Sequence, residues 1–332
     1  MSDVLSAAPW WLIVLLKSAI VLGVVITTFA YAMLFERKIM GWMQLRPGPN
    51  RVGPWGLLQP AADAVKMMFK EDLTPNTADP LMYRLAPFIS LVCAMSAFAV
   101  IPFSESSAGL WGVADVNAGI LVIFAITSIG VYGITLAGWS SGSKFPLLGS
   151  VRSTAQMISY ELAMTMSVIG VLILAGTTSL SGIVHAQHRV WYIVPQIFGF
   201  IIYIITAVAE TNRAPFDLVE AETELVGGFH TEYSGLRFGL FFIAEYLNMI
   251  TVSCIATLLF LGGWNAPLGL TIVPGLVWFV LKAGLFIFMY IWLRTTLPRL
   301  RYDRLMNFGW KVLLPAATLN LMVTAAIVAI VG

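Results

Sequence analysis

Four ionisable side chains lie inside long apolar runs of the sequence, where charge is costly. Lys17 is near one end of its run, so its long side chain can reach the polar headgroups of a membrane. Glu161, Glu245 and Lys282 lie deeper, and each charge costs at least about 2.5–3.5 kcal/mol at the centre of a bilayer. A buried carboxylate needs a positively charged partner or a proton. We therefore expect Glu161 and Glu245 to take up and release protons, with an ion pair between one of them and Lys282 as the alternative.

A second group of carboxylates lies between residues 210 and 232. This segment holds six of the 17 acidic residues of the chain and a single lysine or arginine, Arg213. Apolar side chains such as Phe216 and Leu225 alternate with the charges, so we expect packing against the protein rather than a solvated acidic loop. Crowded carboxylates titrate as a coupled set, and such a set responds to a change of charge nearby. The six are Glu210, Asp217, Glu220, Glu222, Glu224 and Glu232.

The sequence contains no group of cysteines and histidines with the spacing of a metal or redox site. Its two cysteines, Cys93 and Cys254, lie far apart in apolar runs, as small packing residues do. A C-x-x-C motif and the G-x-G-x-x-G loop of dinucleotide sites are both missing. We expect the chain by itself to bind no metal, iron–sulfur cluster or nucleotide.

The composition indicates which elements must position these groups. Of the 332 residues, 59% are hydrophobic and 11% are charged, whereas a soluble domain is about 45–50% apolar and about 25% charged. This excludes a soluble enzyme, a disordered chain and a coiled coil, and the net charge of +2 gives no sign of nucleic-acid binding. We predict an all-α integral membrane protein with eight transmembrane helices. The predicted spans are residues 10–35, 81–103, 119–139, 154–175, 193–209, 236–260, 271–297 and 312–331.

The distribution of lysine and arginine predicts the orientation of these spans. Fifteen such residues lie in or beside the odd-numbered connections, whereas the even-numbered connections and the two tails contain only Arg189. Positive charge remains on the cytoplasmic side. Both termini are therefore expected to face outward, into the periplasm of a bacterium, and the large loops to face the cytoplasm.

The first inward connection, residues 36–80, has two unusual parts. Residues 46–54 are rich in proline and glycine, which excludes a continuous helix and favours a stiff, shaped loop. In residues 57–70 the apolar positions Leu58, Ala62, Val65 and Phe69 follow helical spacing. This pattern predicts an amphipathic helix at the membrane surface, either a plain interfacial anchor or part of a site.

Several motifs closely resemble the H subunit of respiratory complex I, the membrane component of NADH:quinone oxidoreductase that carries the quinone chamber. The resemblance extends over almost the whole chain, from Tyr31 to Lys311. The motifs are Glu36-Arg37-Lys38, the run Arg46-Pro47-Gly48-Pro49-Asn50-Arg51-Val52-Gly53, the run from Ala209 to Leu218, Glu232-Tyr233-Ser234-Gly235, and Pro298-Arg299-Leu300-Arg301-Tyr302-Asp303.

The resemblance, and not composition or spacing, implies quinone as the substrate and a role for the chain as a subunit of a proton-translocating enzyme. It implies a quinone-site loop at residues 36–80 and an acidic coupling loop at residues 210–235. The expected partners are peripheral-arm subunits that carry FMN and iron–sulfur clusters, and small membrane subunits that lead to antiporter-like subunits in the bacterial inner membrane. The matching quinone-site residues are Arg37, Arg46, Asp63 and Lys66. The matching residues of the proton path are Glu161, Glu210, Glu220, Glu222, Glu224, Glu245, Lys282 and Arg294.

Two alternatives remain open at this point. The membrane subunit of an energy-converting hydrogenase shares the fold and the glutamates but binds no quinone, and the long Pro/Gly-rich first connection argues against it. A free-standing ion transporter would be active when purified alone, whereas a complex I subunit would be inert without its partners.

Overall fold

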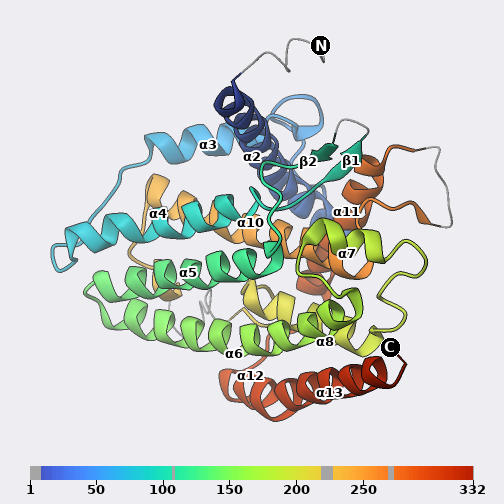
Figure 1. The fold of residues 1–332 in the computed structure, drawn as a ribbon. Coiled ribbons are helices and arrows are strands. Elements are labelled where there is room, and N and C mark those ends of the chain that lie inside the picture. The colour runs from blue at the N-terminus through green and yellow to red at the C-terminus, as the bar shows by residue number, and fades with distance from the viewer. Residues whose placement is uncertain (1–8, 107–108, 218–226, 268–272, 332) are drawn as a thin grey trace.

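The computed structural model describes residues 9–106, 109–217, 227–267 and 273–331, and within these ranges its regular structure is almost entirely helical (Figure 1). The longer helices are α2 Trp10–Met43, α4 Pro80–Ala97, α5 Gly119–Ser140, α6 Lys144–Ala175, α8 Ile197–Glu210, α10 Gly235–Phe260, α11 Gly275–Thr296 and α13 Leu314–Val331. The short helices are α3 Gln59–Phe69, α7 Leu180–Ala186 and α12 Tyr302–Phe308. Single turns of other helix types lie at η1 Pro54–Gly56, η2 Gly228–His230 and η4 Gly309–Leu313.

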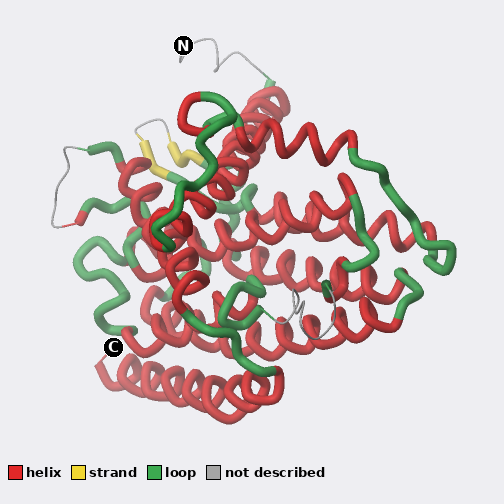
Figure 2. The backbone as a smooth tube through the Cα atoms, turned by 180° about the vertical axis from the view of Figure 1, so that it is seen from behind, coloured by secondary structure: helices red, strands yellow, loops and turns green. Residues whose placement is uncertain are grey.

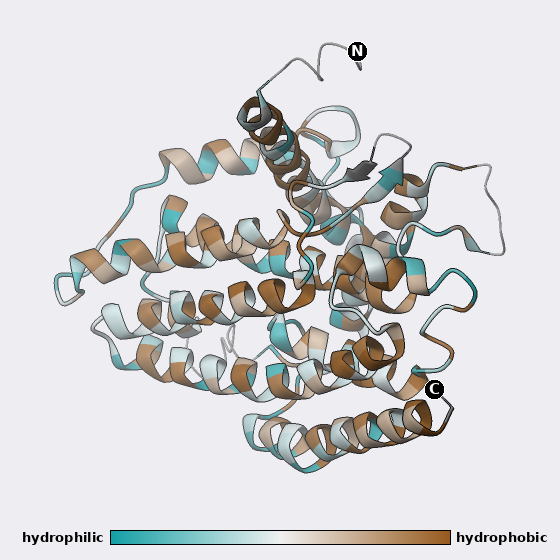
Figure 3. Cartoon of the chain, in the orientation of Figure 1, coloured by the Kyte–Doolittle hydropathy of each residue, from teal (hydrophilic) through white to brown (hydrophobic). Residues whose placement is uncertain are grey.

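Helix α10 is the centre of the bundle. The helices α4, α5 and α6 lie side by side, and α13 packs along α6 (Figures 1 and 2). Helix α10 contacts α4, α11 and α2, and every residue from Met249 to Phe260 is buried. The outer sides of α2 and α13 instead expose large apolar side chains such as Leu15, Val24 and Met322. Both helices are coloured largely as hydrophobic in Figure 3. A buried core within an apolar exterior is the arrangement expected where the surrounding solvent is lipid.

Seven of the described helices are long and apolar enough to cross a membrane, which confirms a helical multi-pass membrane protein. The segment expected as an eighth span at residues 193–209 is helical only over the 14 residues of α8. That length is roughly 21 Å, less than the ~30 Å hydrocarbon core. Residues 192–196 form turns instead. There the side-chain oxygen of Gln187 accepts a hydrogen bond from the backbone N–H of Tyr192, and the Ile193 N–H donates to the Phe260 carbonyl.

Other elements differ from the expectation in length. Helix α2 continues past residue 35 to Met43, and α6 begins at Lys144 rather than at residue 154. The last span extends back through the π-helical turn η4 and α12, so that one continuous candidate span runs from Tyr302 to Ile330. In each case charged residues at the end of the helix hid its start or end in a hydropathy profile.

Helix α3 confirms a helix within residues 57–70. One small sheet was not expected. Strands β1 Ser104–Ser106 and β2 Gly109–Trp111 pair antiparallel, with Ser104 opposite Trp111. The sheet lies beside the N-terminal part of α11, and a hydrogen bond from the Phe103 N–H to the Trp111 carbonyl extends it.

The connections at each end of the bundle are joined to one another. At one end the Asp79 N–H, before α4, donates to the carbonyl of Ser140, the last residue of α5. At the other end the Ile120 N–H, at the start of α5, donates to the Thr178 carbonyl after α6. The two bonds show that consecutive helices run in opposite directions, as alternating spans must.

Candidate functional site

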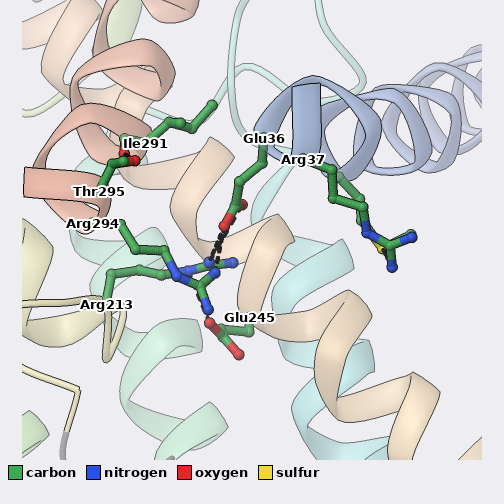
Figure 4. A network of polar contacts seen from close by, with 8 residues as sticks. Glu36, Arg37, Arg213, Glu245, Ile291, Arg294 and Thr295 are labelled. Atoms are coloured by element: carbon green, nitrogen blue, oxygen red, sulfur yellow. Dashed lines mark hydrogen bonds and ion pairs between the residues drawn. The ribbon is translucent and has the colours of Figure 1, made fainter. Parts of the chain in front are cut away.

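Four charged side chains from four separate segments meet at one buried point (Figure 4). Glu36 comes from α2, Arg213 from the segment after α8, Glu245 from α10 and Arg294 from α11. The Nη1 atom of Arg213 lies 3.1 Å from Glu36 Oε1, and its Nε lies 2.9 Å from Glu245 Oε1. Arg294 forms a second ion pair with the same oxygen of Glu36. One arginine therefore joins a carboxylate of α2 to a carboxylate of α10.

Arg213 is held by contacts of both its side chain and its backbone. Its side chain is 4% exposed, and its guanidinium carbon lies 4.2 Å from the ring centroid of Tyr246. Its backbone carbonyl accepts the N–H of Phe216, and its own N–H donates to the carbonyl of Val208. Burial alone would lower the pKa of Arg213, but the negative charges of Glu245 and Glu36 outweigh it and raise the pKa above its usual value. The guanidinium is thus permanently positive, as paired buried arginines are.

Glu245 and Glu210 line the same internal pocket. This pocket lies between α4, α5, α10 and the segments around residues 211 and 230, and has a volume of about 60 Å³. Such a space accommodates a few water molecules. Asn212 and Asn248 also line it, so water there finds hydrogen-bond partners on several sides. We call this space the carboxylate pocket.

Glu161 stands next to this group rather than within it. It lies on α6 and accepts a hydrogen bond from the hydroxyl of Ser128 on α5. Met157, one turn earlier on α6, lines the carboxylate pocket. The structure thus places Glu161, Glu210 and Glu245 in one region of the bundle, although the sequence separates them by up to 84 residues (245 − 161).

Lys282 lies elsewhere, against the far end of α10. Its ammonium donates to the backbone carbonyls of Leu261, Gly263 and Asn265 at 2.6, 2.9 and 2.7 Å. The same nitrogen lies 4.3 Å from the ring centroid of Trp191. These carbonyls follow the C-terminus of α10, where a positive charge is favourable. The geometry favours a capping role, and the place of Lys282 in a proton path stays a prediction of the resemblance.

We expect Lys282→Met to lower the free energy of unfolding on the order of 2 kcal/mol, because three buried carbonyls lose their donor. Lys282→Arg keeps the donor and the charge but cannot release its proton, so it should retain most of the stability and of the proton translocation. Thermal denaturation and membrane-potential measurements on both variants check this. Loss of proton translocation in a stable Lys282→Arg variant would instead make Lys282 a proton carrier.

The expected quinone-site residues lie at the opposite end of α10. Arg37 Nη1 and Asp63 Oδ2 form an ion pair at 2.8 Å, which ties α2 to α3, and Gln59 donates to the other oxygen of Asp63. Arg37, Asp63 and Lys66 line a pocket of about 480 Å³ between α2, α3 and the start of α10. We call it the α3 pocket. Arg37 also lines a neighbouring pocket of about 440 Å³ together with Arg46, so all four residues border two adjoining spaces.

Some of the predicted site residues lie outside the described residues, and two residues of the site were not predicted from the sequence. Glu220, Glu222 and Glu224 belong to residues 218–226, which the structure does not describe. Sequence reasoning took Glu36 as part of a motif and Arg213 as a counter-charge, and assigned neither to a site. The sequence did contain a sign of their role, because both lie within motifs of the resemblance. Glu36 is adjacent to Arg37, and Arg213 lies in the same motif as Glu210. Lys17, also singled out by its charge, lies exposed on the N-terminal half of α2.

The chain is similar to known proteins over almost its whole length. A family model described as NADH dehydrogenase matches residues 16–325. The chain is 51% identical over 319 residues to an H subunit of NADH-quinone oxidoreductase from Symbiobacterium thermophilum, covering 96% of this chain and 97% of the relative. It is 52% identical to the H subunit of Deinococcus deserti, covering 97% and 86%, and 49% identical to that of Brevibacillus brevis, covering 99% and 98%. The similarity extends over nearly the full length of each protein, so this chain belongs to the NADH dehydrogenase family.

Proposed function

We propose that this chain is the membrane subunit of a proton-translocating NADH:quinone oxidoreductase. Its relatives are named as the H subunit of that enzyme over almost their entire length. The observation that carries the mechanism is the ion network of Glu36, Arg213 and Glu245, because it joins the helix beside the α3 pocket to the carboxylate pocket. A change of charge on one side can thus act on the other.

The loop of residues 36–80 forms the quinone site together with the peripheral arm. Arg37, Asp63 and Lys66 place polar groups around the α3 pocket, and Arg46 does so in the adjoining one. Helix α3 exposes Val65, Met68 and Phe69 at 53%, 67% and 87%. An amphipathic helix of this kind lies in the membrane interface, where an apolar quinone tail can enter from the lipid.

The segment of residues 210–235 couples quinone reduction to proton movement. Glu161, Glu210 and Glu245 form the described part of the path, with Arg294 acting on it through Glu36. Glu220, Glu222 and Glu224 extend the path toward the quinone site, as the resemblance implies. The resemblance also implies Lys282, but its three carbonyl contacts support a capping role rather than a proton-carrying one.

The chain supplies the quinone site and the proton path, whereas its partners supply the electrons. Among the described residues no group of three or more histidine, cysteine or acidic side chains could hold a metal. FMN and iron–sulfur clusters belong in peripheral-arm subunits, and small membrane subunits lead on to antiporter-like subunits. The chain functions in the bacterial inner membrane.

The eighth crossing is completed by α8 together with the turns at residues 192–196, so both termini lie in the periplasm. We expect a cysteine at Asn117 or Asn265 to react with an impermeant thiol reagent added to intact cells from outside, because both positions lie in connections poor in positive charge. A cysteine at Asn50 should react only after the cytoplasmic face is opened. The reverse labelling pattern would contradict the orientation.

The function is tested by Arg46→Ala in the assembled complex. Quinone reduction should fall at least about tenfold, because the planar guanidinium that borders the quinone site is lost, while electron transfer from NADH to a soluble artificial acceptor stays intact. Arg46→Lys should rescue only in part. Arg189→Ala, an exposed arginine at the opposite end of the bundle, is the matched control. Equal loss of both activities in Arg46→Ala would mean that the residue supports assembly instead.

The relatives' names do not favour the alternative of an energy-converting hydrogenase. The alternative of a free-standing transporter is tested by co-purification. Flavin and iron–sulfur subunits should travel with this chain in mild detergent, and ion transport by the isolated chain would contradict the proposal.

A further inference from the structure

The carboxylate pocket and the α3 pocket share two of their lining residues. His230 and Phe238 border both spaces. His230 ends the turn η2, and Phe238 lies on the first turn of α10. The boundary between a space lined by glutamates and a space lined by the proposed quinone-site residues is therefore formed by one aromatic ring and one imidazole.

The imidazole of His230 is positioned by aromatic rings on two sides. Its ring centroid lies 5.0 Å from that of Phe229 at an interplanar angle of 89°, and 5.3 Å from that of Phe238 at 66°. Edge-to-face packing of this kind restricts the orientation of a ring. The two neighbours set the plane of the ring, and a rotation by half a turn about its Cβ–Cγ bond keeps that plane.

The backbone that carries His230 is anchored as well. Gly228 begins the turn with a φ of 63°, and a Cβ atom on Gly149 of α6 would lie 2.8 Å from the Gly228 backbone. On the far side of the turn, Tyr83 and Tyr233 stack at 4.2 Å, and Tyr83 donates to the Glu232 carbonyl at 2.7 Å. The turn thus packs against α6 and α5, and the residues that follow it are tied to α4.

Ionisable groups line both of the pockets that His230 borders. In the carboxylate pocket these are Glu210, Glu245 and Cys93. In the α3 pocket they are Arg37, Asp63, Lys66, Lys70 and Tyr233. Histidine is the residue best suited to exchange protons between two such groups near neutral pH, because both of its nitrogens can carry the proton.

We propose that His230 transfers protons between the carboxylate pocket and the quinone side of the protein. This inference rests on the proposed function. Reduction of one quinone consumes two electrons, supplied by the partner subunits, and two protons. One ring nitrogen of His230 accepts a proton from the carboxylate pocket, and the other releases its proton to the α3 pocket. The ring then returns to its starting tautomer by rotation. Each transfer removes one proton from the carboxylate pocket, so quinone reduction changes the charge of the glutamates that line it.

The test uses the complete complex in membranes with His230→Gln, which keeps hydrogen-bonding capacity but cannot be protonated. General acid–base catalysis contributes about 10²–10⁴-fold, and water in the two pockets replaces part of it. We therefore expect quinone reduction to fall about tenfold or more, with electron transfer to a soluble acceptor unchanged. His188→Gln, an exposed histidine at the far end of the bundle, is the matched control.

A second variant separates proton transfer from a structural role. His230→Ala leaves a space next to the α3 pocket, and added imidazole should restore quinone reduction in it, because free imidazole carries protons in the same way. An unchanged rate of quinone reduction in the assembled His230→Gln complex would overturn the inference. If the glutamine variant does not assemble, a lack of rescue of His230→Ala by imidazole would overturn it instead. If His230→Gln is normal while Arg46→Ala still loses quinone reduction, the inference fails and the proposed function stands.

Discussion

Arg213→Met is expected to be the most damaging single substitution in this chain. It leaves the carboxylates of Glu36 and Glu245 without the guanidinium that joins them, and Glu36 is 3% exposed. Removing one partner of a buried ion pair typically costs about 3–5 kcal/mol, because the remaining charge stays buried. We expect little of the variant to be incorporated into the complex, and what is incorporated to unfold at a markedly lower temperature. Native gel electrophoresis and thermal denaturation measure both.

Two further variants show whether charge is the cause. Arg301→Met is the control, because Arg301 forms an ion pair with Asp303 in which both side chains are exposed, at 77% and 64%. Such a pair contributes about 0–1 kcal/mol. Adding Glu36→Gln to Arg213→Met removes the buried carboxylate charge that has lost one of its two arginine partners, and should recover part of the stability. Wild-type assembly and stability of Arg213→Met alone would rule out the network as a support of the fold.

Glu245→Gln should abolish quinone reduction and membrane-potential generation together, while assembly survives. The amide keeps the size and shape of the carboxylate that lies 2.9 Å from Arg213 Nε, but it can no longer change charge. If proton movement is obligatorily coupled to quinone reduction, a path that cannot be protonated at this point stops both reactions. Glu245→Asp is one methylene shorter and should retain part of the activity.

Both activities are measured with the same membranes, and electron transfer from NADH to a soluble acceptor reports the amount of intact peripheral arm. Glu105→Gln is the matched control, because Glu105 is 43% exposed and lies in the small sheet at the other end of the bundle. A fully assembled Glu245→Gln complex with normal quinone reduction and normal membrane potential would remove Glu245 from the mechanism.

The sequence alone determined the class of protein and most of its helices. Apolar runs of about 20 residues are recognisable locally, because each must match the thickness of the hydrocarbon core by itself. The helix α3 was predictable for the same reason, since its apolar spacing is a property of eleven adjacent residues. The start of α8 was not recognisable in this way, because the turns before it hydrogen-bond to other elements. The start of α8 is set by the side chain of Gln187 and by the end of α10.

The tertiary structure alone decided which charges meet. Sequence reasoning offered Lys282 as a partner for Glu161 or Glu245, but folding places Lys282 on the carbonyls after α10 and gives Glu245 to Arg213. Glu36 and Arg213 are 177 residues apart, and His230 borders both pockets only because η2 packs against α6 and α5. A sequence reveals which charges lie in apolar surroundings, and each of these must have a partner. Its partner depends on which helices pack together, and that is decided by the shapes of all the buried side chains at once.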